Sequence, residues 1–289
     1  MHVRIIANPI SGGGRGPRTA EALATALTAH RISSEIRITT RAGDAHAWAA
    51  EPGADCVVSV GGDGTLNEVA TALAGSGIPV ATLPLGTANV VAHELRTPHD
   101  PSALAALIAR GATRRIDVGR SGERLFLLGA GAGLDAAIVE VVHRNRGAKL
   151  SFASYVWPAV RTILSYAYPR ITVTVDGEKI CDDAHYVIVG NCQWSAGVFR
   201  ATPEARIDDG LLDVCILRRL GVLKILWLIL LAQFPGFAKR RAVQYRQGRH
   251  VELVATGGER IPLQIDGDPA DALPVKFHIE PRGLCVVGE

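Results

Sequence analysis

The sequence predicts an α/β protein in which an N-terminal parallel sheet is followed by a C-terminal antiparallel β-sandwich. Two observations predict this fold class. Before Ile116, short apolar runs alternate with helical segments, as in a parallel sheet covered by helices on both faces. From Ile116 onward, strand-like segments are separated by turn signals, which is typical of antiparallel hairpins. The 289 residues are enough for two domains of ordinary size.

The first domain is expected to span residues 1–116. Most of its strands are short, mainly apolar runs, as strands covered on both faces are. We expect them at Val3–Ala7, Glu35–Ile38, Cys56–Val60 and Val80–Leu83. The segments between and after them have helical composition, and we expect helices at Thr19–Ala29, Ala45–Ala50, Leu66–Ala74 and Ala88–Leu95.

The second domain is expected to span residues 117–280. Aspartate–glycine pairs, which favour tight hairpin turns, separate several of its expected strands. These strands are Leu125–Leu128, Ile171–Val175, Tyr186–Val189, Leu212–Leu217, Val251–Val254 and Leu263–Ile265. Helices are expected at Ser151–Tyr166 and Val222–Gln233. A final strand, Leu284–Val287, is compatible with either domain, so residues 281–289 are candidates to complete the first.

The composition excludes several classes of protein. Hydrophobic residues make up 48% and charged residues 20%, which indicates a folded chain rather than a disordered one. A formal net charge of +3 is too small to indicate nucleic-acid binding. The longest apolar run, Ile225–Ala232, is far short of the ~20 residues that span a bilayer, and the N-terminus has no signal-peptide pattern. Five cysteines without a C-x-x-C pair fit buried thiols in a reducing cytosol, so we expect a cytoplasmic protein.

The strongest chemical signal is a glycine-rich turn that runs from Gly61 to Glu68, after a buried strand and at the start of a helix. Backbone N–H groups and the helix dipole make such a turn an anion site. Asp63 would repel a phosphate unless Mg²⁺ or a reacting hydroxyl lies between them. Taken alone, the G-G-D-G sequence is also compatible with an ordinary turn and a helix N-cap.

Two more polar, glycine-bearing loops follow other strands of the first domain. Asn8–Gly14 follows the first expected strand, and Pro84–Asn89 follows the fourth. In a parallel sheet, all three loops emerge at the carboxyl ends of the strands, where open α/β sheets bind ligands. Their convergence favours a binding site over three unrelated turns.

Six motifs in a fixed order span nearly the whole chain. They are N-P-x-S-G (Asn8–Gly12), G-G-D-G-T-L-N-E (Gly61–Glu68), P-L-G-T-A-N (Pro84–Asn89), I-D-V-G (Ile116–Gly119), D-G-L-L-D (Asp209–Asp213) and D-G-D (Asp266–Asp268). This set resembles the diacylglycerol-kinase catalytic-domain family, which includes bacterial lipid kinases and the sphingosine and ceramide kinases. The resemblance implies an NAD-kinase/phosphofructokinase-like nucleotide domain, a β-sandwich lipid-substrate domain, and ATP bound between the two.

The resemblance also implies roles for individual residues. Asp268 matches the acid usually taken as the general base, with Asp63 and Asp266 as the other candidates. Asp209 matches a Mg²⁺ position that is structural or catalytic, together with the backbone carbonyls of Arg206 and Leu211. The positions matched to ATP binding are Asn8, Ser11, Gly12, Thr39, Gly61, Gly62, Asp63, Gly64, Thr65, Leu66, Asn67, Glu68, Gly86, Thr87 and Asp266.

The chain departs from the family pattern at two positions. Ala88 stands where the family commonly has glycine, which a negative φ would tolerate. Asp268 stands where the family has glutamate, which keeps the carboxylate but shortens its reach by one methylene. The second departure leaves the choice between Asp268, Asp266 and Asp63 open.

Basic and aromatic residues gather in two stretches that contain no acidic residue. Arg144, Arg146, Lys149, Arg161 and Arg170 lie between residues 141 and 175. Between residues 216 and 251, the aromatic side chains Trp227, Phe234 and Phe237 accompany Arg218, Arg219, Lys224, Lys239, Arg240, Arg241, Arg246 and Arg249. Such a segment suits an anionic membrane surface. The alternative is that these helices pack on the β domain and that their arginines bind Mg²⁺-ATP or solvent.

These features together predict an ATP-dependent lipid kinase that works at the inner face of the membrane. Its expected partners are a lipid substrate at an anionic surface and a second copy of the chain, with no nucleic acid. The acceptor is a diacylglycerol-like, ceramide, sphingoid or related lipid. The alternatives are a soluble-substrate kinase of the NAD-kinase type, which shares the glycine turn, and a nucleotide-binding regulator without catalysis.

The basic stretch yields a test of membrane contact. Changing Lys239, Arg240 and Arg241 together to glutamate is expected to weaken binding to anionic liposomes, by about 1 kcal/mol for each charge near the surface. Raising the salt concentration should weaken wild-type binding in the same way, because surface charges are screened. Liposome co-sedimentation measures both effects. Binding that is unchanged in both experiments would favour helices packed on the β domain.

Overall fold

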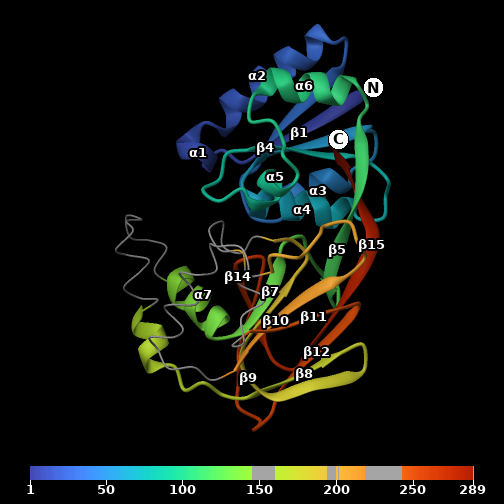
Figure 1. Cartoon of the computed structure of the whole chain (residues 1–289). Helices are drawn as coiled ribbons and strands as arrows, with labels where there is room; N and C mark the ends of the chain where they lie inside the picture. The colour runs from blue at the N-terminus through green and yellow to red at the C-terminus, as the bar shows by residue number, and fades with distance from the viewer. Residues whose placement is uncertain (145–159, 194–199, 201, 219–242, 289) are drawn as a thin grey trace. The chain divides into compact units, whose positions relative to one another are not determined.

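The computed structural model describes residues 1–144, 160–193, 200, 202–218 and 243–288. The chain divides into two compact units (Figure 1). Unit 1 comprises Met1–Val118 and Glu280–Glu289, and unit 2 comprises Gly119–Ile279. The sequence placed the corresponding boundaries between residues 116 and 117 and between residues 280 and 281.

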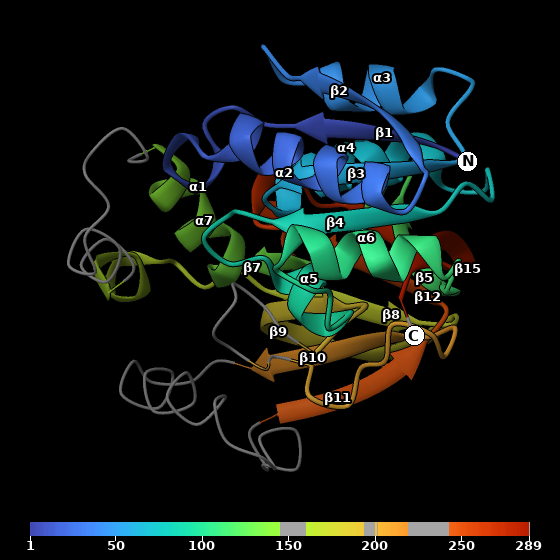
Figure 2. The ribbon, with the colours of Figure 1, turned by 90° about the horizontal axis from the view of Figure 1, so that it is seen from above.

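Unit 1 is built on parallel strands with helices on both faces, as the sequence predicts. Its strands β1 (His2–Ala7), β2 (Ser33–Ile38), β3 (Cys56–Gly61) and β4 (Val80–Pro84) lie in the order β4-β3-β1-β2. Helices α2 (Gly16–Ala29) and α6 (Pro101–Ala109) pack together over one face, and α3 (Asp44–Ala50) and α4 (Asp63–Leu73) over the other (Figure 2). The short helices α1 (Ser11–Gly14) and α5 (Val90–Glu94) complete the unit.

The register of unit 1 brings the carboxyl ends of its strands side by side. Ala7, the last residue of β1, pairs with Val60 on β3 and with Ile38 on β2. The last residues of β3 and β4, Gly61 and Pro84, pair with each other. The loops that follow these strands therefore start from one edge of the sheet, as expected for a parallel sheet.

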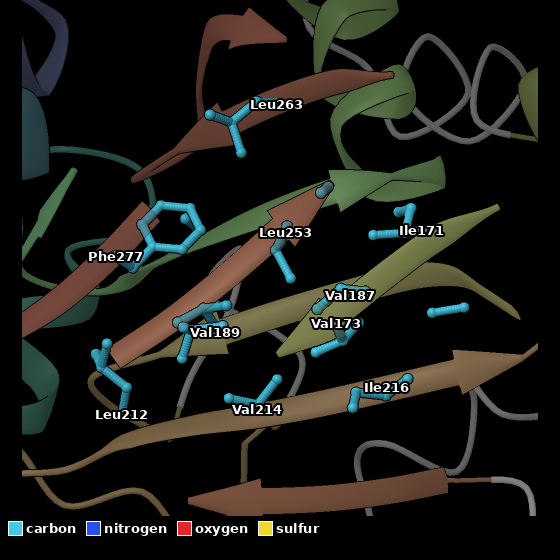
Figure 3. Close-up of a cluster of buried hydrophobic side chains, with 14 of the residues drawn as sticks. Ile171, Val173, Val187, Val189, Leu212, Val214, Ile216, Leu253, Leu263 and Phe277 are labelled. Carbon is cyan, nitrogen blue, oxygen red and sulfur yellow. The ribbon is translucent and has the colours of Figure 1, made fainter. Parts of the chain in front are cut away.

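Unit 2 is antiparallel throughout its described strand pairs. Strand β9 (Glu178–Gly190) pairs with β7 (Gly129–Gly133), β8 (Ile171–Val175) and β10 (Leu212–Arg218). The remaining strands are β6 (Arg124–Phe126), β11 (Val243–Gly248), β12 (His250–Ala255), β13 (Pro262–Ile265) and β14 (Asp268–Ala272). Alternate side chains of these strands form one apolar core (Figure 3). Within it, the rings of Phe126 and Phe277 meet edge to face with centroids 5.8 Å apart.

Two strands run across the boundary between the units. Strand β5 (Thr113–Ser121) passes it once, and β15 (Val275–Val287) passes it again near the C-terminus. The first residues of β15 pair antiparallel with β12 in unit 2, and Val286 pairs parallel with Val80 of β4 in unit 1. The final strand, which the sequence could not allot to one domain, therefore contributes to both.

The structure differs from the sequence prediction in several elements. The sequence did not predict α6, or α7 (Leu134–Arg144), which follows the glycine-rich strand β7. The helix expected at Ala88–Leu95 begins only at Val90, because Asn89 has a left-handed backbone with φ 49°. Of the helix expected at Ser151–Tyr166, residues 160–165 are helical and 151–159 lie outside the described residues, as does the whole of Val222–Gln233.

Two expectations about the chain as a whole can be compared with the structure. All five cysteines are buried free thiols. Within the described ranges, no helix combines the length and the apolar character needed to cross a membrane. The basic stretch with Trp227, Phe234 and Phe237 lies outside the described residues, except for its ends.

The close contact between Gly119 and Phe126 yields a prediction about stability. A Cβ atom at residue 119 would lie 2.1 Å from the Phe126 ring, which is fully buried against Phe277. We expect Gly119→Ala to lower the free energy of unfolding by about 1–3 kcal/mol, since overpacking forces neighbours to shift. Gly288→Ala is the matched control, because its nearest atom would be 3.8 Å away. Equal denaturant midpoints for the two variants would contradict the prediction.

Candidate active site

Asn8 joins the first glycine-bearing loop of unit 1 to the second. Its backbone N–H donates to the carbonyl of Val60 at 3.0 Å, and its side-chain amide donates to Thr65 Oγ1 at 3.4 Å. Its side-chain oxygen accepts the N–H of Ile10 at 3.1 Å. A Cβ at residue 16 would lie 2.1 Å from the Asn8 carbonyl, so only glycine fits there. The start of the first loop is therefore held by its neighbours.

Three successive glycines follow Ser11 in this loop with left-handed backbones. Gly12, Gly13 and Gly14 have φ values of 62°, 71° and 91°, which residues with a side chain rarely adopt. A Cβ added at Gly13 or Gly14 would meet nothing within 4 Å, whereas one at Gly12 would lie 3.3 Å from Leu85 Cβ. The loop therefore leaves its backbone open to a ligand while its first glycine approaches the third loop.

The second and third loops touch through two glycines. A Cβ on Gly86 would lie 2.7 Å from the Cα of Gly62, and one on Gly62 would lie 3.2 Å from the Cα of Gly86. The N–H of Leu85 donates to the carbonyl of Gly61 at 2.8 Å. This contact requires glycine at residue 86 and leaves little room for a side chain at residue 62. It lies beside the N-terminus of α4, where unpaired N–H groups attract anions.

Asp63 has structural partners that its position in the sequence does not reveal. It is the first residue of α4 and not part of a free loop, and the helix starts three residues earlier than the predicted Leu66. Its carboxylate accepts the backbone N–H of Val90 at 3.1 Å and that of Val91 at 3.2 Å, so it caps α5. Burial raises the pKa of Asp63 above its ordinary value, although these hydrogen bonds act to lower it. Its oxygens retain lone pairs for a metal or a hydroxyl.

Several other expected nucleotide residues also hold the loops of unit 1 together. Thr39 is buried and bonds the carbonyl of Ala7 through both its N–H and its hydroxyl. Glu68 accepts the N–H groups of Gly43 at 3.1 Å and Ala45 at 3.2 Å at the start of α3. Thr65 and Leu66 are buried, Gly64 and Thr87 are exposed, and Ser11 and Asn67 are half-buried. Leu66 can therefore offer a ligand only its backbone.

Asp266 anchors a tight turn in unit 2. Its carboxylate accepts three backbone N–H groups at 2.9–3.0 Å, those of Leu127, Leu128 and Gly129. Both Asp266 and Gly267 have positive φ, as the central residues of a type I′ hairpin turn do. These bonds assign Asp266 a structural role, which its match to an ATP position does not anticipate.

Asp268 is the residue that the turn presents. It opens β14 directly after Gly267, and its side chain is half exposed. His143 on α7 lies beside it, with 4.0 Å between His143 Nδ1 and an Asp268 carboxylate oxygen. Asp268 and Asp266 belong to unit 2, whereas Asp63 belongs to unit 1.

The expected metal residues form a second turn in unit 2. Asp209 accepts the N–H of Leu211 at 3.0 Å, and Arg206 pairs with Asp208 at 3.5 Å. Among the described residues, no group of three or more His, Cys, Asp or Glu side chains is placed to hold a metal. The expected set has one carboxylate and two backbone carbonyls, all hard oxygen ligands of the kind that Mg²⁺ prefers.

Asp213, two residues beyond this turn, supplies an observation that fits a cation. It is fully buried on β10, where one carboxylate oxygen accepts from the Tyr245 hydroxyl and from Gln247. The other oxygen is buried and has no hydrogen-bond partner among the described residues. Burial raises the pKa of Asp213 to about 6, and the negative charges of Asp209 and Glu204 add to this effect. A cation near these carboxylates would offset the cost of burying Asp213 and its repulsion by Asp209 and Glu204.

The sequence assigned no role to α7, although this helix packs on β7, β13 and β14. It brings Asp135 and His143 to the side of the Asp266–Asp268 turn. The only sequence signal is an acidic residue in the first helical turn after the run Gly129–Gly133. That signal has a common alternative explanation, since acidic residues favour helix N-termini.

Comparison with known proteins identifies the family of the chain. A model of the diacylglycerol kinase catalytic domain matches residues 2–121, and a model of the YegS C-terminal NAD kinase beta sandwich-like domain matches residues 129–288. The chain therefore belongs to the diacylglycerol kinase catalytic-domain family, a family of kinases.

Similar proteins match the chain over most of their length. A protein of Mycobacterium tuberculosis named diacylglycerol kinase is 31% identical over 309 residues, covering 99% of this chain and 94% of its own. A diacylglycerol kinase of Staphylococcus saprophyticus is 27% identical and covers 96% of this chain and 93% of its own. The crystal structure of a diacylglycerol kinase from Bacillus anthracis has a TM-score of 0.81, at 23% identity, and covers 100% of this chain and 97% of that one. At that identity the likeness supports the fold alone.

The capping role of Asp63 yields a prediction. Asp63→Ala removes the acceptor of two N–H groups of α5, so we expect a loss of about 1–2 kcal/mol in the free energy of unfolding. Asp100→Ala is the matched control, because Asp100 caps α6 through the N–H of Ala103 at 2.8 Å and lies outside the three loops. Thermal and denaturant unfolding measure both losses of stability. Titration with ATP is expected to show weaker binding for Asp63→Ala but not for Asp100→Ala. Wild-type stability in Asp63→Ala would contradict the capping role.

Proposed function

We propose that this kinase transfers the γ-phosphate of ATP to the hydroxyl group of a lipid at a membrane surface. Family membership supports phosphoryl transfer, and the names of the similar proteins favour a diacylglycerol-like acceptor. The observation that carries the proposal is the meeting of three glycine-bearing loops at the carboxyl ends of β1, β3 and β4.

The three loops fit a nucleotide's phosphates. Gly62 and Gly86 leave no side chain between the second and third loops, and Gly13 and Gly14 leave the first open. The N-terminus of α4 adds N–H groups and a favourable dipole. ATP bound there with Mg²⁺ supplies an electrophilic phosphorus with part of its charge neutralised. The residues of the loops then orient the phosphates and exclude water.

The remaining requirement is a group that takes the proton of the attacking hydroxyl. We propose Asp268 as this base, because the turn presents it with half of its side chain exposed, whereas Asp266 already accepts three N–H groups. Asp63 is the second candidate and can instead hold Mg²⁺ near the phosphates. Asp209, with the carbonyls of Arg206 and Leu211, is proposed to hold another Mg²⁺ in unit 2.

A membrane surface is the proposed place of reaction, because the acceptor is a lipid. The basic stretch between residues 216 and 251 favours a membrane surface, and its residues Arg246 and Arg249 are described and exposed. Lys239, Arg240 and Arg241 of this stretch are outside the described residues. The proposed location is the inner face of the membrane, with the protein bound peripherally.

Asp268 is tested by changing its charge and its length. We expect Asp268→Asn to reduce turnover by about 10²–10⁴-fold, the usual effect of losing a general base, with little change in ATP affinity. Asp268→Glu should retain substantial activity, because it keeps the carboxylate. Transfer of radioactive phosphate from ATP to a lipid extract, and to NAD in parallel, measures turnover and acceptor class. Turnover of Asp268→Asn within a few-fold of wild type would exclude Asp268 as the base, and transfer to NAD alone would overturn the lipid proposal.

A further inference from the structure

A half-buried carboxylate lies behind the turn that carries Asp268. Asp135 lies in the first turn of α7, and burial raises its pKa above the ordinary value. One of its oxygens accepts from the side-chain amide of Gln264 at 2.8 Å, and the other accepts from the Tyr186 hydroxyl at 3.4 Å. Both donors are neutral groups, so these contacts offset only part of the cost of burying a charge.

Strand β7 leaves room for this contact at one glycine. A Cβ at Gly131 would lie 1.9 Å from the carboxylate of Asp135 and 2.8 Å from the amide nitrogen of Gln264. The backbone of β7 therefore lies directly against the pair formed by Asp135 and Gln264. A side chain at residue 131 would separate them.

Gln264 makes a second hydrogen bond with the other end of its amide. Its Oε1 accepts the backbone N–H of Gly267 at 2.8 Å, while its Nε2 donates to Asp135. The Gly267 N–H can only donate, and an ionised Asp135 can only accept, so the two contacts together determine which way the Gln264 amide points. With the amide reversed, its NH₂ group would face the N–H of Gly267, and the carbonyl would face the carboxylate. Both contacts would be repulsive.

The turn is thus held from two sides. Asp266 bonds the backbone of residues 127–129, and Gly267 is held through Gln264 by Asp135. Asp268 follows immediately as the first residue of β14, so the position of its Cα depends on both anchors. The second anchor starts from α7, which also brings His143 to 4.0 Å from Asp268.

We propose that Asp135 and Gln264 are positioning residues that act through the Gly267 N–H to hold Asp268 in place for proton transfer. The inference rests on the proposed function, in which Asp268 is the base. Because misplacement of a reacting group by about 1 Å can cost 10²-fold in rate, the effect is expected in turnover. The ATP-binding candidates Asn8, Gly62 and Gly86 are in unit 1, so the KM for ATP should change little.

The first test changes the polarity of Gln264 alone. Gln264→Glu places two carboxyl groups 2.8 Å apart, and turnover is measured above the pH at which they share a proton, where their repulsion is expected to displace the turn. We expect turnover to fall by about 10²-fold. Asp135→Asn still offers an acceptor to Gln264 but no longer fixes the direction of its amide, so its loss of turnover should be smaller than that of Gln264→Glu.

The second test restores the chain of hydrogen bonds with its polarity reversed. In Asp135→Asn/Gln264→Glu, the new amide donates to the new carboxylate, which still accepts from Gly267. We expect this double variant to recover turnover to within about 5-fold of wild type, as coupled neighbours do in a double-mutant cycle. In Asp135→Asn/Gln264→Met, the methionine is similar in length to glutamine but offers no oxygen to the Gly267 N–H. The turnover of this variant should stay low. Comparing the two double variants tests the positioning role even if the single variant Gln264→Glu does not fold.

Amide hydrogen exchange at Gly267 gives a readout that does not depend on activity. Exchange should be slow in the wild type and in Asp135→Asn/Gln264→Glu, and fast in Asp135→Asn/Gln264→Met. Equal turnover of the two double variants would overturn the inference. So would a folded Gln264→Glu with wild-type turnover, or an Asp135→Asn loss as large as that of Gln264→Glu. A wild-type protein that phosphorylates no lipid would instead overturn the proposed function, and the exchange pattern would still test the hydrogen-bond chain.

Discussion

The backbones of Gly62 and Gly86 approach so closely that a side chain at Gly86 would collide with Gly62 and one at Gly62 would be crowded, and the candidate phosphate site of unit 1 depends on this contact. Parallel pairing of β3 with β4 ends with Gly61 beside Pro84, so the two loops leave the sheet together. The carboxylate of Asp63 then ties the second loop to α5. A site for an anion results mainly from backbone geometry, and the side chains around it keep that geometry in place.

In unit 2, hydrogen bonds hold the two-residue turn of Asp266 and Gly267 in place. The carboxylate of Asp266 fastens the turn to the link between β6 and β7, and Gln264 fastens it toward α7. Buried polar groups are costly unless they are paired, and in this turn each bond constrains the residue that follows it. Asp268 thereby has a defined position on the hairpin, as its proposed role as proton acceptor requires.

Several acidic residues that the sequence assigns to catalysis or to nucleotide binding have structural partners in the folded chain. Asp63 caps α5, Glu68 caps the start of α3, and Asp266 binds three amides. Such partners are contributed by segments that are distant in the sequence, so spacing within a motif cannot reveal them. This chain therefore depends on these carboxylates for the shape of its loops as well as for any role toward ATP or Mg²⁺.

The sequence by itself determined the fold class, because apolar runs such as Cys56–Val60 are buried on both faces of a parallel sheet, while D-G turns separate antiparallel strands. It also located the three loops, since glycine-rich turns at strand ends are local features. Only the tertiary structure decided that β15 serves both units, and that Asp135 meets Gln264 at 2.8 Å across 129 positions of the chain. Helix α7 was not predicted from the sequence for the same reason, because the strands that it packs on include β13 and β14, which come much later in the sequence.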